Sequence, residues 1–478
     1  MSDAKSNKKT LFSSMIWKLM ERASVQIITL ITQIILARII APEKFGSLSL
    51  IVVFYNIADL LVQKGFGISL IRKKAISQED IDSVTFVSCI VAGIAFIVIQ
   101  LLAPFVGYIY NDNSLVNPLR LLSVNLLISP IYCVYNSILI RNMKFKVIFY
   151  RGLAASIISG IIGVSLAALG YEIWALVAQM IANQIVITLM MVKSEKISLH
   201  FKFRKDSFKE VFSFGKNVLV TELLLTLVEN IRTLFIGRFY SKSDLAYYDR
   251  GQLYPATLMR AIYDTLFSIL IPHFSKFQDK NKEIASQYTY LTYISCVIIM
   301  PIFVGLASVS EEVILILLTD KWKFAIVYMQ IFCLYQAVFP YQIVAKAVLY
   351  AVGNSERVLK LEIIKAIFSL TLMIISLYFG VLYVAISLII VRLFSDTLYI
   401  LSVEKAIGKN KAVINTWKPI LATIIMFIVV KIAEVANFTV YLSLLVKLLC
   451  GVVAYILIIS ILDRQLLSLI IKKFRRAE

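Results

Sequence analysis

Eight ionisable side chains inside long apolar stretches are the residues of this sequence with the most potential for chemistry. They are five cations, Arg22, Lys64, Arg232, Arg260 and Lys346, and three carboxylates, Asp59, Glu229 and Asp264. A charge at bilayer depth is costly, so it usually faces a cavity or a partner. We expect the cations to line an inward-opening cleft for an anionic group, because arginine makes paired contacts with phosphate oxygens. The carboxylates are candidates for carrying a coupling ion.

Several charges within the apolar stretches lie one helical turn from a residue of opposite sign. These pairs are Glu229/Arg232, Arg260/Asp264, Arg392/Asp396 and Lys431/Glu434. A spacing of three or four residues places both members on one helix face, where they can neutralise each other. Each pair is therefore open to a structural and a functional interpretation. Lys64, Arg141 and Lys346 lie near the ends of their stretches, where contact with lipid phosphates is the alternative.

No pattern typical of an enzyme active site accompanies these charges. The sequence has no glycine loop for phosphates and no Ser-His-Asp set, and His200 and His273 lack metal-ligand spacing. All five cysteines fall inside apolar runs and do not resemble a disulfide framework. We therefore predict no enzymatic activity, no metal and no cofactor, and an ion gradient as the energy source of any uphill transport.

The amino-acid composition indicates the class of protein in which these charges occur. The chain has 478 residues, of which 60% are hydrophobic and 16% charged, and its mean hydropathy is +0.84. Soluble domains contain about half apolar and a quarter charged residues. An all-α integral membrane protein is the class that fits.

A membrane-spanning helix needs about 20 mostly apolar residues. The sequence predicts fourteen such spans, at 15–40, 46–69, 83–110, 118–140, 152–170, 173–192, 217–240, 251–273, 287–308, 325–350, 361–379, 382–402, 418–436 and 441–462. The spans suggest a six-helix half at 1–192, a basic cytoplasmic linker at 193–216 and a second six-helix half at 217–402. Two extra helices and a basic tail would then occupy 403–478.

Two internal echoes, in which a segment of one half is similar in sequence to a segment of the other, indicate that the halves are duplicated. Residues 31–46 and 231–246 align so that Arg38 matches Arg238, with a short polar turn after each. Residues 130–139 align with 340–349 at nearly the same offset, each segment beginning with proline. Two similar bundles facing each other are common in transporters.

The distribution of positive charge predicts the orientation. Of 49 Lys and Arg residues, 32 fall in segments on the side of the termini and six in segments on the other side. Since cytoplasmic loops are rich in Lys and Arg, both termini should be cytoplasmic. The net charge of +20 is then a signal of orientation and of contact with lipid head groups, so no nucleic-acid partner is expected.

The turn Ala37–Gly46, which reads ARIIAPEKFG, resembles the Wzx-type polysaccharide exporters of the multidrug/oligosaccharidyl-lipid/polysaccharide superfamily. Residues 65–71 and 247–251 resemble that family's second-helix glycine stretch and the turn before its eighth helix. The nearest subgroup is the fourteen-span branch that includes the colanic-acid exporter. Ile40 departs from the usual Leu or Gly, so the motifs identify the superfamily better than the substrate.

The resemblance implies a MATE-like fold that flips an undecaprenyl-pyrophosphate-linked oligosaccharide across the bacterial inner membrane by alternating access. The glycan would be an O-antigen, capsule or exopolysaccharide repeat unit. The five cations would bind the pyrophosphate, and Gln26, Gln33 and Asn230 would hydrogen-bond to sugars. Membrane lipids, and a polymerase and glycosyltransferases of the same pathway, are the implied partners.

Two other functions remain open. A membrane polymerase or ligase of the same pathway would resemble a many-span protein with a large outer loop, and the outer loops here are short. A drug or metabolite exporter on the same fold would have a more acidic or more apolar cleft.

The first prediction concerns topology. Reporter fusions after Lys209 and Lys411 should give cytoplasmic signals, and fusions near Asn113 and Asp244 should give external ones. The reason is the excess of Lys and Arg in the segments assigned to the cytoplasm. A cytoplasmic signal at Asp244 would contradict the model of two equal halves.

Overall fold

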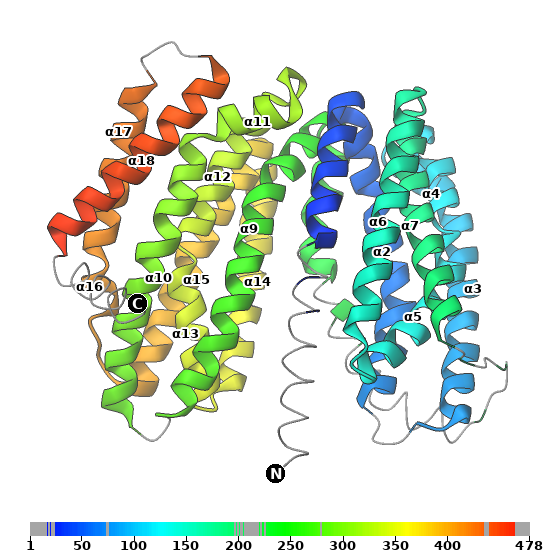
Figure 1. Cartoon of the computed structure of the whole chain (residues 1–478), viewed down its shortest axis with the longest axis horizontal. Coiled ribbons are helices and arrows are strands. Elements are labelled where there is room, and N and C mark those ends of the chain that lie inside the picture. Colours follow the sequence, from blue (N-terminus) through cyan, green and yellow to red (C-terminus); the bar gives the residue numbers. More distant parts are fainter. Residues whose placement is uncertain are drawn as a thin grey trace. The chain divides into compact units, whose positions relative to one another are not determined.

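The computed structural model describes residues 24–72, 76–195, 226–277, 280–434 and 439–463, together with the single positions 17, 20, 197, 200, 204, 219, 222 and 223. Throughout these residues the regular structure is helical, and no strand occurs among them (Figure 1). Backbone groups inside a bilayer must be hydrogen-bonded within the protein, which a helix achieves along its own length. The predicted all-α membrane class is confirmed.

Ten of the described segments are long and apolar enough to cross a membrane. They are α2 (Pro42–Arg72, apolar over Pro42–Gln63), α3 (Gln78–Ile109), η1 (Asn113–Leu115) with α4 (Val116–Leu122) and α5 (Asn125–Arg141), α6 (Phe145–Ala168), α7 (Glu172–Ser194), α10 (Asn281–Ser308), α12 (Ala325–Ala337) with α13 (Pro340–Ala351), α15 (Val381–Ile407), α16 (Ala412–Asn415) with α17 (Trp417–Ala433), and α18 (Val440–Leu462). The protein is therefore a multi-pass membrane protein.

Four predicted spans are not among these ten. Two are long helices that carry more charge, α9 (Lys242–Ser275) and α14 (Ser355–Leu377). The other two are described only in part, as the apolar helix Ser24–Ile39 and a helix over 226–239. The total of fourteen spans stays a prediction.

The chain separates into two compact units, Met1–Leu245 and Ala246–Glu478. The boundary falls just after the start of α9, so the helix at 226–239 belongs to the first unit. Most of the predicted linker at 193–216 lies outside the described residues. The division into two six-helix halves, a linker and a C-terminal pair stays a prediction.

The order of helices repeats along the chain. In each unit a one-turn 3-10 helix, η1 or η2 (Asp320–Trp322), precedes a span that is broken into two helices. The first break lies at residues 123–124 and the second at 338–339. The two prolines of the second echo lie near these breaks, Pro130 inside α5 and Pro340 at the start of α13. Pro340 is tolerated because it lies in the first turn of α13, whereas Pro130 lies inside α5, where it removes a backbone donor and is expected to kink the helix.

The two segments of the first echo, 31–46 and 231–246, contact each other within the first unit. Gly46 on α2 lies so close to the backbone of Lys242 that a methyl group at this glycine would overlap the Lys242 carbonyl. Gly237 lies similarly close to the side chain of Leu50. Both segments therefore require glycine, because the two helices meet there with no room for a side chain.

An ion pair between Lys242 and Asp112 lies beside this contact. Burial alone would raise the pKa of Asp112, but hydrogen bonds from the Lys242 ammonium and from Ser114 outweigh it and lower the pKa. The Tyr110 hydroxyl also donates to the Leu234 carbonyl at 3.3 Å. The turn after α3 is thus attached to the segment 231–246 by charge and by hydrogen bonding.

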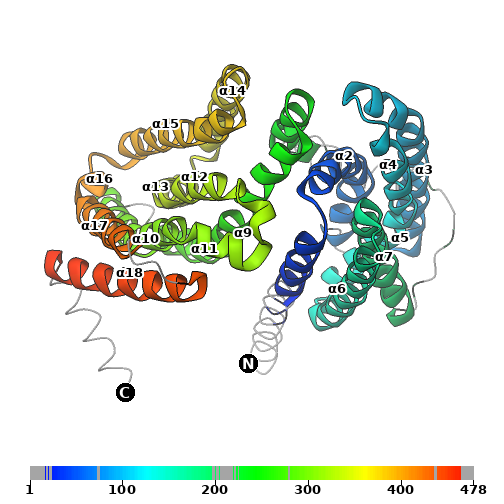
Figure 2. The same ribbon diagram turned by 90° about the horizontal axis from the view of Figure 1, so that it is seen from above.

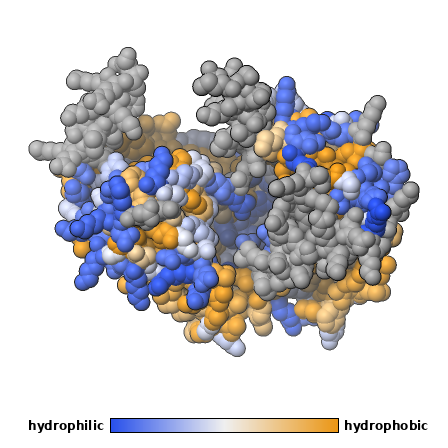
Figure 3. All heavy atoms as spheres, turned by 90° about the horizontal axis from the view of Figure 1, so that it is seen from below, coloured by the Kyte–Doolittle hydropathy of each residue, from blue (hydrophilic) through white to orange (hydrophobic). Residues whose placement is uncertain are grey.

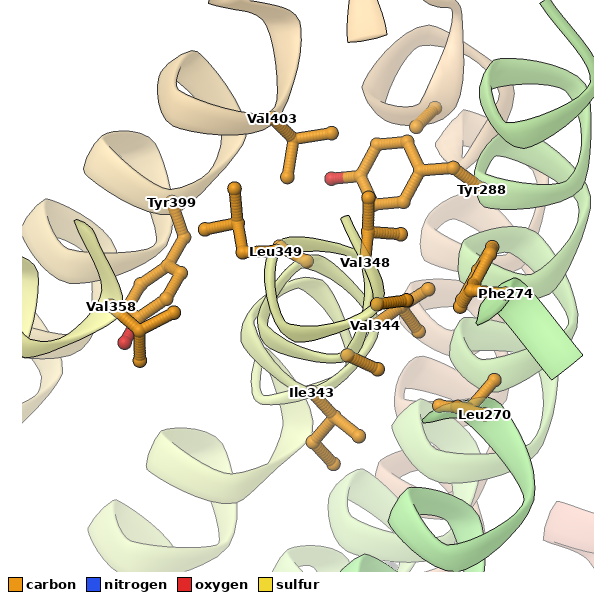
Figure 4. Packing of buried hydrophobic residues seen from close by; sticks show 14 of the residues in the cluster. Leu270, Phe274, Tyr288, Ile343, Val344, Val348, Leu349, Val358, Tyr399 and Val403 are labelled. Carbon is orange, nitrogen blue, oxygen red and sulfur yellow. The ribbon is translucent and has the colours of Figure 1, made fainter. Parts of the chain in front are cut away.

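In the second unit, α13 is the central element of the apolar core. Its residues Ile343, Val344, Val348 and Leu349 are fully buried. Figure 4 shows this helix surrounded by labelled side chains of α9, α10, α14 and α15, which are Leu270, Phe274, Tyr288, Val358, Tyr399 and Val403. A charged residue on α13 therefore needs an ion-pair or hydrogen-bond partner inside the protein.

At the edge of the second unit, α17 and α18 pack side by side and α17 lies against α10 (Figure 2). Seen from below, hydrophilic side chains gather over the helix ends of this unit, next to hydrophobic ones (Figure 3). Large apolar side chains such as Leu449, Val453 and Ile461 on α18 are exposed, as expected for a surface in contact with lipid.

A buried ion pair attaches α18 to α11 (Ser310–Leu318). Lys447 lies 2.6 Å from Glu312, and the two side chains are only 3% and 6% exposed. Lys447 also lies 3.4 Å from Glu434, which in turn pairs with Lys431 at 2.6 Å. The expected pair Lys431/Glu434 therefore forms, as part of a larger network.

The second prediction concerns this pair. Lys447→Met should lower the free energy of unfolding by about 3 kcal/mol, because it leaves the buried Glu312 carboxylate without a compensating charge. Glu312→Gln should cost less, because Lys447 keeps Glu434 as a partner. The double variant should cost clearly less than the two single costs combined. Unfolding of the purified protein in detergent can be followed with a thiol-reactive dye, since Cys133, Cys296 and Cys333 are buried.

Lys431→Met is the matched control, because the Lys431 side chain is 44% exposed and exposed pairs contribute at most about 1 kcal/mol. Equal and additive costs for Glu312 and Lys447 would show that the two charges do not stabilise each other.

Candidate functional site

The carboxylate Asp59 is held between α2 and α5 in the first unit. The Ser129 hydroxyl donates to Asp59 Oδ1 at 2.5 Å, and Gln63 Nε2 donates to Oδ2 at 2.7 Å. Gln63 lies one turn further along α2, whereas Ser129 comes from α5, directly before Pro130. The carboxylate is thus positioned by neutral donors, and no ion pair to Asp59 occurs among the described residues.

A charged cluster lies on the inner faces of α13, α14 and α15 in the second unit. Glu362 Oε1 accepts from the Lys346 ammonium at 3.1 Å and from the Tyr399 hydroxyl at 2.8 Å. Its Oε2 lies 3.5 Å from the Lys365 ammonium. Two ammonium groups therefore share one carboxylate, which leaves the cluster with a net positive charge.

The cluster is neither fully buried nor open. The exposed fractions of the Lys346, Lys365 and Glu362 side chains are 22%, 25% and 34%. Partial burial strengthens the interaction of these ammonium groups with an anion, because water screens them less. Because the cluster is accessible and carries an excess positive charge, it can bind a phosphate group.

A second polar group lies one turn before Lys346 on α13 and is almost wholly buried. Arg392 donates to Gln342, and Gln342 Nε2 donates to Ser395 Oγ at 3.2 Å. The Arg392 guanidinium also lies 4.2 Å from the centre of the Tyr335 ring and 4.0 Å from that of Phe339. These rings stabilise the cation through their π faces.

Asp396 follows Arg392 by one turn of α15 and is 4% exposed. Neither of its carboxylate oxygens accepts a hydrogen bond from the described part of the chain. The expected pair Arg392/Asp396 therefore differs from a simple ion pair, since the guanidinium is engaged by Gln342 and two aromatic rings.

The eight residues selected from the sequence lie in different surroundings. Arg22 lies outside the described residues, as does the side chain of Lys64. Arg232 is half-buried, while Glu229, Arg260 and Asp264 are exposed. Lys346 and Asp59 lie in the hydrogen-bonded networks described above. Arg22, Lys64 and Arg232 belong to the first unit and Arg260 and Lys346 to the second, so a cleft shared by all five stays a prediction.

Sequence reasoning missed Glu362, Lys365 and Tyr399. Glu362 and Lys365 are three residues apart at the start of a predicted span, which is the same signal that identified the other pairs. Both lie at the end of the predicted span 361–379 that the charge distribution places on the cytoplasmic side, where charged residues are common. No group of three or more histidine, cysteine or acidic residues that could bind a metal occurs among the residues described.

The helical order and the apolar surface agree with known transport proteins of low sequence identity. The structure is similar to the lipid II flippase MurJ in its inward closed conformation, with a TM-score of 0.74 and 16% identity over 95% of this chain and 100% of that one. It is also similar to an inward-facing multidrug resistance MATE family transporter, with a TM-score of 0.61 and 14% identity over 82% of this chain and 98% of that one. The expected MATE-like fold is confirmed.

Relatives share more sequence but only part of their length. The succinoglycan biosynthesis transport protein ExoT of Rhizobium meliloti (strain 1021) is 21% identical over 328 residues, which cover 67% of this chain and 65% of that protein. The lipopolysaccharide biosynthesis protein WzxC of Escherichia coli (strain K12) is 22% identical over 312 residues, 64% of this chain and 62% of that one. The chain thus spans somewhat less than two thirds of the length of each.

The family model described as "Polysaccharide biosynthesis protein" matches residues 35–327, a range that contains the turn at 37–46 and most of the helices described above. The chain belongs to this polysaccharide biosynthesis protein family.

Proposed function

We propose that this protein flips an undecaprenyl-pyrophosphate-linked oligosaccharide from the inner to the outer leaflet of the bacterial inner membrane by alternating access. The oligosaccharide would be a repeat unit of an O-antigen, a capsule or an exopolysaccharide. Both termini would lie in the cytoplasm, and a polymerase and glycosyltransferases would act before and after transport. In this proposal the protein moves its substrate and makes or breaks no bond in it.

The cluster of Lys346, Lys365 and Glu362 is the observation that carries the proposal. A pyrophosphate is a multiply charged anion, and moving it through a bilayer requires cations at membrane depth. Lys346 and Lys365 exceed their shared carboxylate by one charge and remain partly accessible. The excess charge therefore allows an incoming pyrophosphate oxygen to bind the ammonium groups while Glu362 stays in place.

Relatives and fold support the same substrate class. The matched relatives are a succinoglycan transport protein and a lipopolysaccharide biosynthesis protein, and the similar structures are transporters, one of them named a lipid II flippase. Among the three carboxylates suggested from sequence, Asp59 is best placed to carry a coupling ion, because it is half-buried and held by neutral donors.

The two competing functions make different demands on the chain. A polymerase or ligase needs catalytic residues and a large outer loop. The longest described connection that we assign to the outer side, residues 309–324, is short and consists largely of the helices α11 and η2. An exporter of cationic drugs needs a negative binding site, whereas the cluster at Lys346 is positive.

The third prediction tests the substrate. Deleting the gene should abolish one surface or secreted polysaccharide and cause its lipid-linked repeat unit to accumulate in the inner leaflet.

Point variants in a complementing copy of the gene test the lysine cluster. Lys346→Gln should lower export at least tenfold at equal protein level, and Lys346→Arg should retain part of the export. The matched control is Lys360→Gln, because Lys360 is an exposed cation on α14.

The double variant Lys346→Gln with Glu362→Gln distinguishes substrate binding from folding. Restored protein level without restored export supports a role of Lys346 in substrate handling. Recovery of both would mean that the pair is structural. Normal polysaccharide with altered drug sensitivity in the deletion strain would favour the drug-exporter function.

The fourth prediction tests coupling. In proteoliposomes, an imposed proton or sodium gradient should accelerate flipping by the wild type and have no effect on Asp59→Asn, which keeps the shape of the side chain but removes the charge and one of the two accepting oxygens. Glu229→Gln and Asp264→Asn, which alter exposed carboxylates, should respond to the gradient like the wild type. A gradient response that persists in Asp59→Asn and disappears in one of the other variants would assign ion coupling to the residue changed in that variant.

A further inference from the structure

A polar cavity of about 270 Å³ lies inside the first unit, between the helix Ser24–Ile39 and helices α5, α6 and α7. Its walls include Val25, Tyr132, Asn136, Phe145, Ser156 and Asn183. Two other cavities, one beside α18 and one between α2 and α3, have mostly apolar walls. This cavity differs from them in offering several hydrogen-bonding groups to an occupant.

Three of these groups retain unused hydrogen-bonding capacity. The Asn183 amide donates to Ser159 Oγ at 3.2 Å, which leaves its carbonyl oxygen for another donor. The side chains of Asn136 and Ser156 have no hydrogen-bond partner among the described residues, although both line the cavity. A polar group without a partner in an apolar environment is costly, so these groups require water or a ligand.

The chemistry of the walls defines the ligand. None of the described wall residues carries a formal charge, so these walls offer no ionic partner to a phosphate or a cation. Amide and hydroxyl groups provide both donors and acceptors, while Tyr132 and Phe145 add aromatic surface for an apolar ring face. A sugar ring has this combination of hydroxyl groups around its edge and C–H groups on its faces.

The size of the cavity fits the same class. Its volume is that of about nine water molecules at liquid density, enough for a single sugar ring with a few remaining waters. A whole oligosaccharide would not fit. The cavity is therefore suited to one residue of a longer chain.

We infer that this cavity binds one neutral sugar residue of the lipid-linked substrate, with Asn136 as its principal hydrogen-bonding residue. The inference rests on the proposed function and adds a chemically separate subsite to it. The cavity would recognise a sugar residue, independently of the lysine cluster proposed for the pyrophosphate. Selection between glycans would then depend on neutral hydrogen bonds.

The test compares two lipids on the purified full-length protein in nanodiscs. One is undecaprenyl pyrophosphate, and the other is the same lipid carrying a single N-acetylglucosamine or galactose. The wild type should bind at least one of the sugar-bearing lipids about tenfold more tightly than the bare lipid. Asn136→Leu, which keeps the number and branching of the side-chain heavy atoms but removes the amide, should reduce this preference to about one without changing affinity for the bare lipid.

Two further variants complete the design. Asn117→Leu makes the same change at an exposed position of α4 and should leave the preference unchanged. Asn136→Ser keeps a hydroxyl group and should retain part of the preference. The unfolding temperature of each variant, followed with the thiol-reactive dye, should equal that of the wild type.

Each result distinguishes the inference from the proposed function. Equal binding of bare and sugar-bearing lipids by the wild type, or an unchanged preference in Asn136→Leu, would overturn the inference and leave the flippase proposal standing. Tighter binding of all lipids by Asn136→Leu would show an apolar occupant and would also overturn it. Binding of neither lipid by the wild type would overturn both.

Discussion

A bilayer offers no hydrogen-bond partners, and this constraint governs how every polar group on these helices is placed. Glu362 is held by two lysines and a tyrosine, Asp59 by a serine and a glutamine, and Lys447 by Glu312 and Glu434. In each case the partners come from more than one helix. Polar groups therefore fix the relative positions of helices whose apolar surfaces would permit several arrangements.

The two units meet this constraint differently. In the first, glycine contacts bring helices close together, and Asp59 is satisfied by uncharged groups. In the second, the central helix α13 carries a fully apolar face together with Gln342 and Lys346, which are one turn apart. The same helix thus supplies core packing and the charged cluster. A site placed on so buried an element has little freedom to move independently of its unit.

Much of this architecture could be predicted from sequence. Apolar runs located the helices, the Ala37–Gly46 turn indicated the family, and residue spacing identified the pair Lys431/Glu434. Local spacing is informative because residues three or four apart share a helix face. The contacts between Lys346 and Glu362, Ser129 and Asp59, and Glu312 and Lys447 join different helices, and no periodicity within one helix reports them. For the same reason the polar cavity at Asn136 could not be foreseen, since four separate helices form its walls.

The close contact between Gly46 and Lys242 has a consequence for biosynthesis. The chain enters the membrane from its N-terminus, so α2 is inserted long before its partner at residue 242 exists. At a synthesis rate of about 5–20 residues per second, the delay is roughly 10–40 s. During that interval the Gly46 face of α2 has only lipid or other early helices to contact. The first unit can therefore complete its packing only after its last residues have been synthesised.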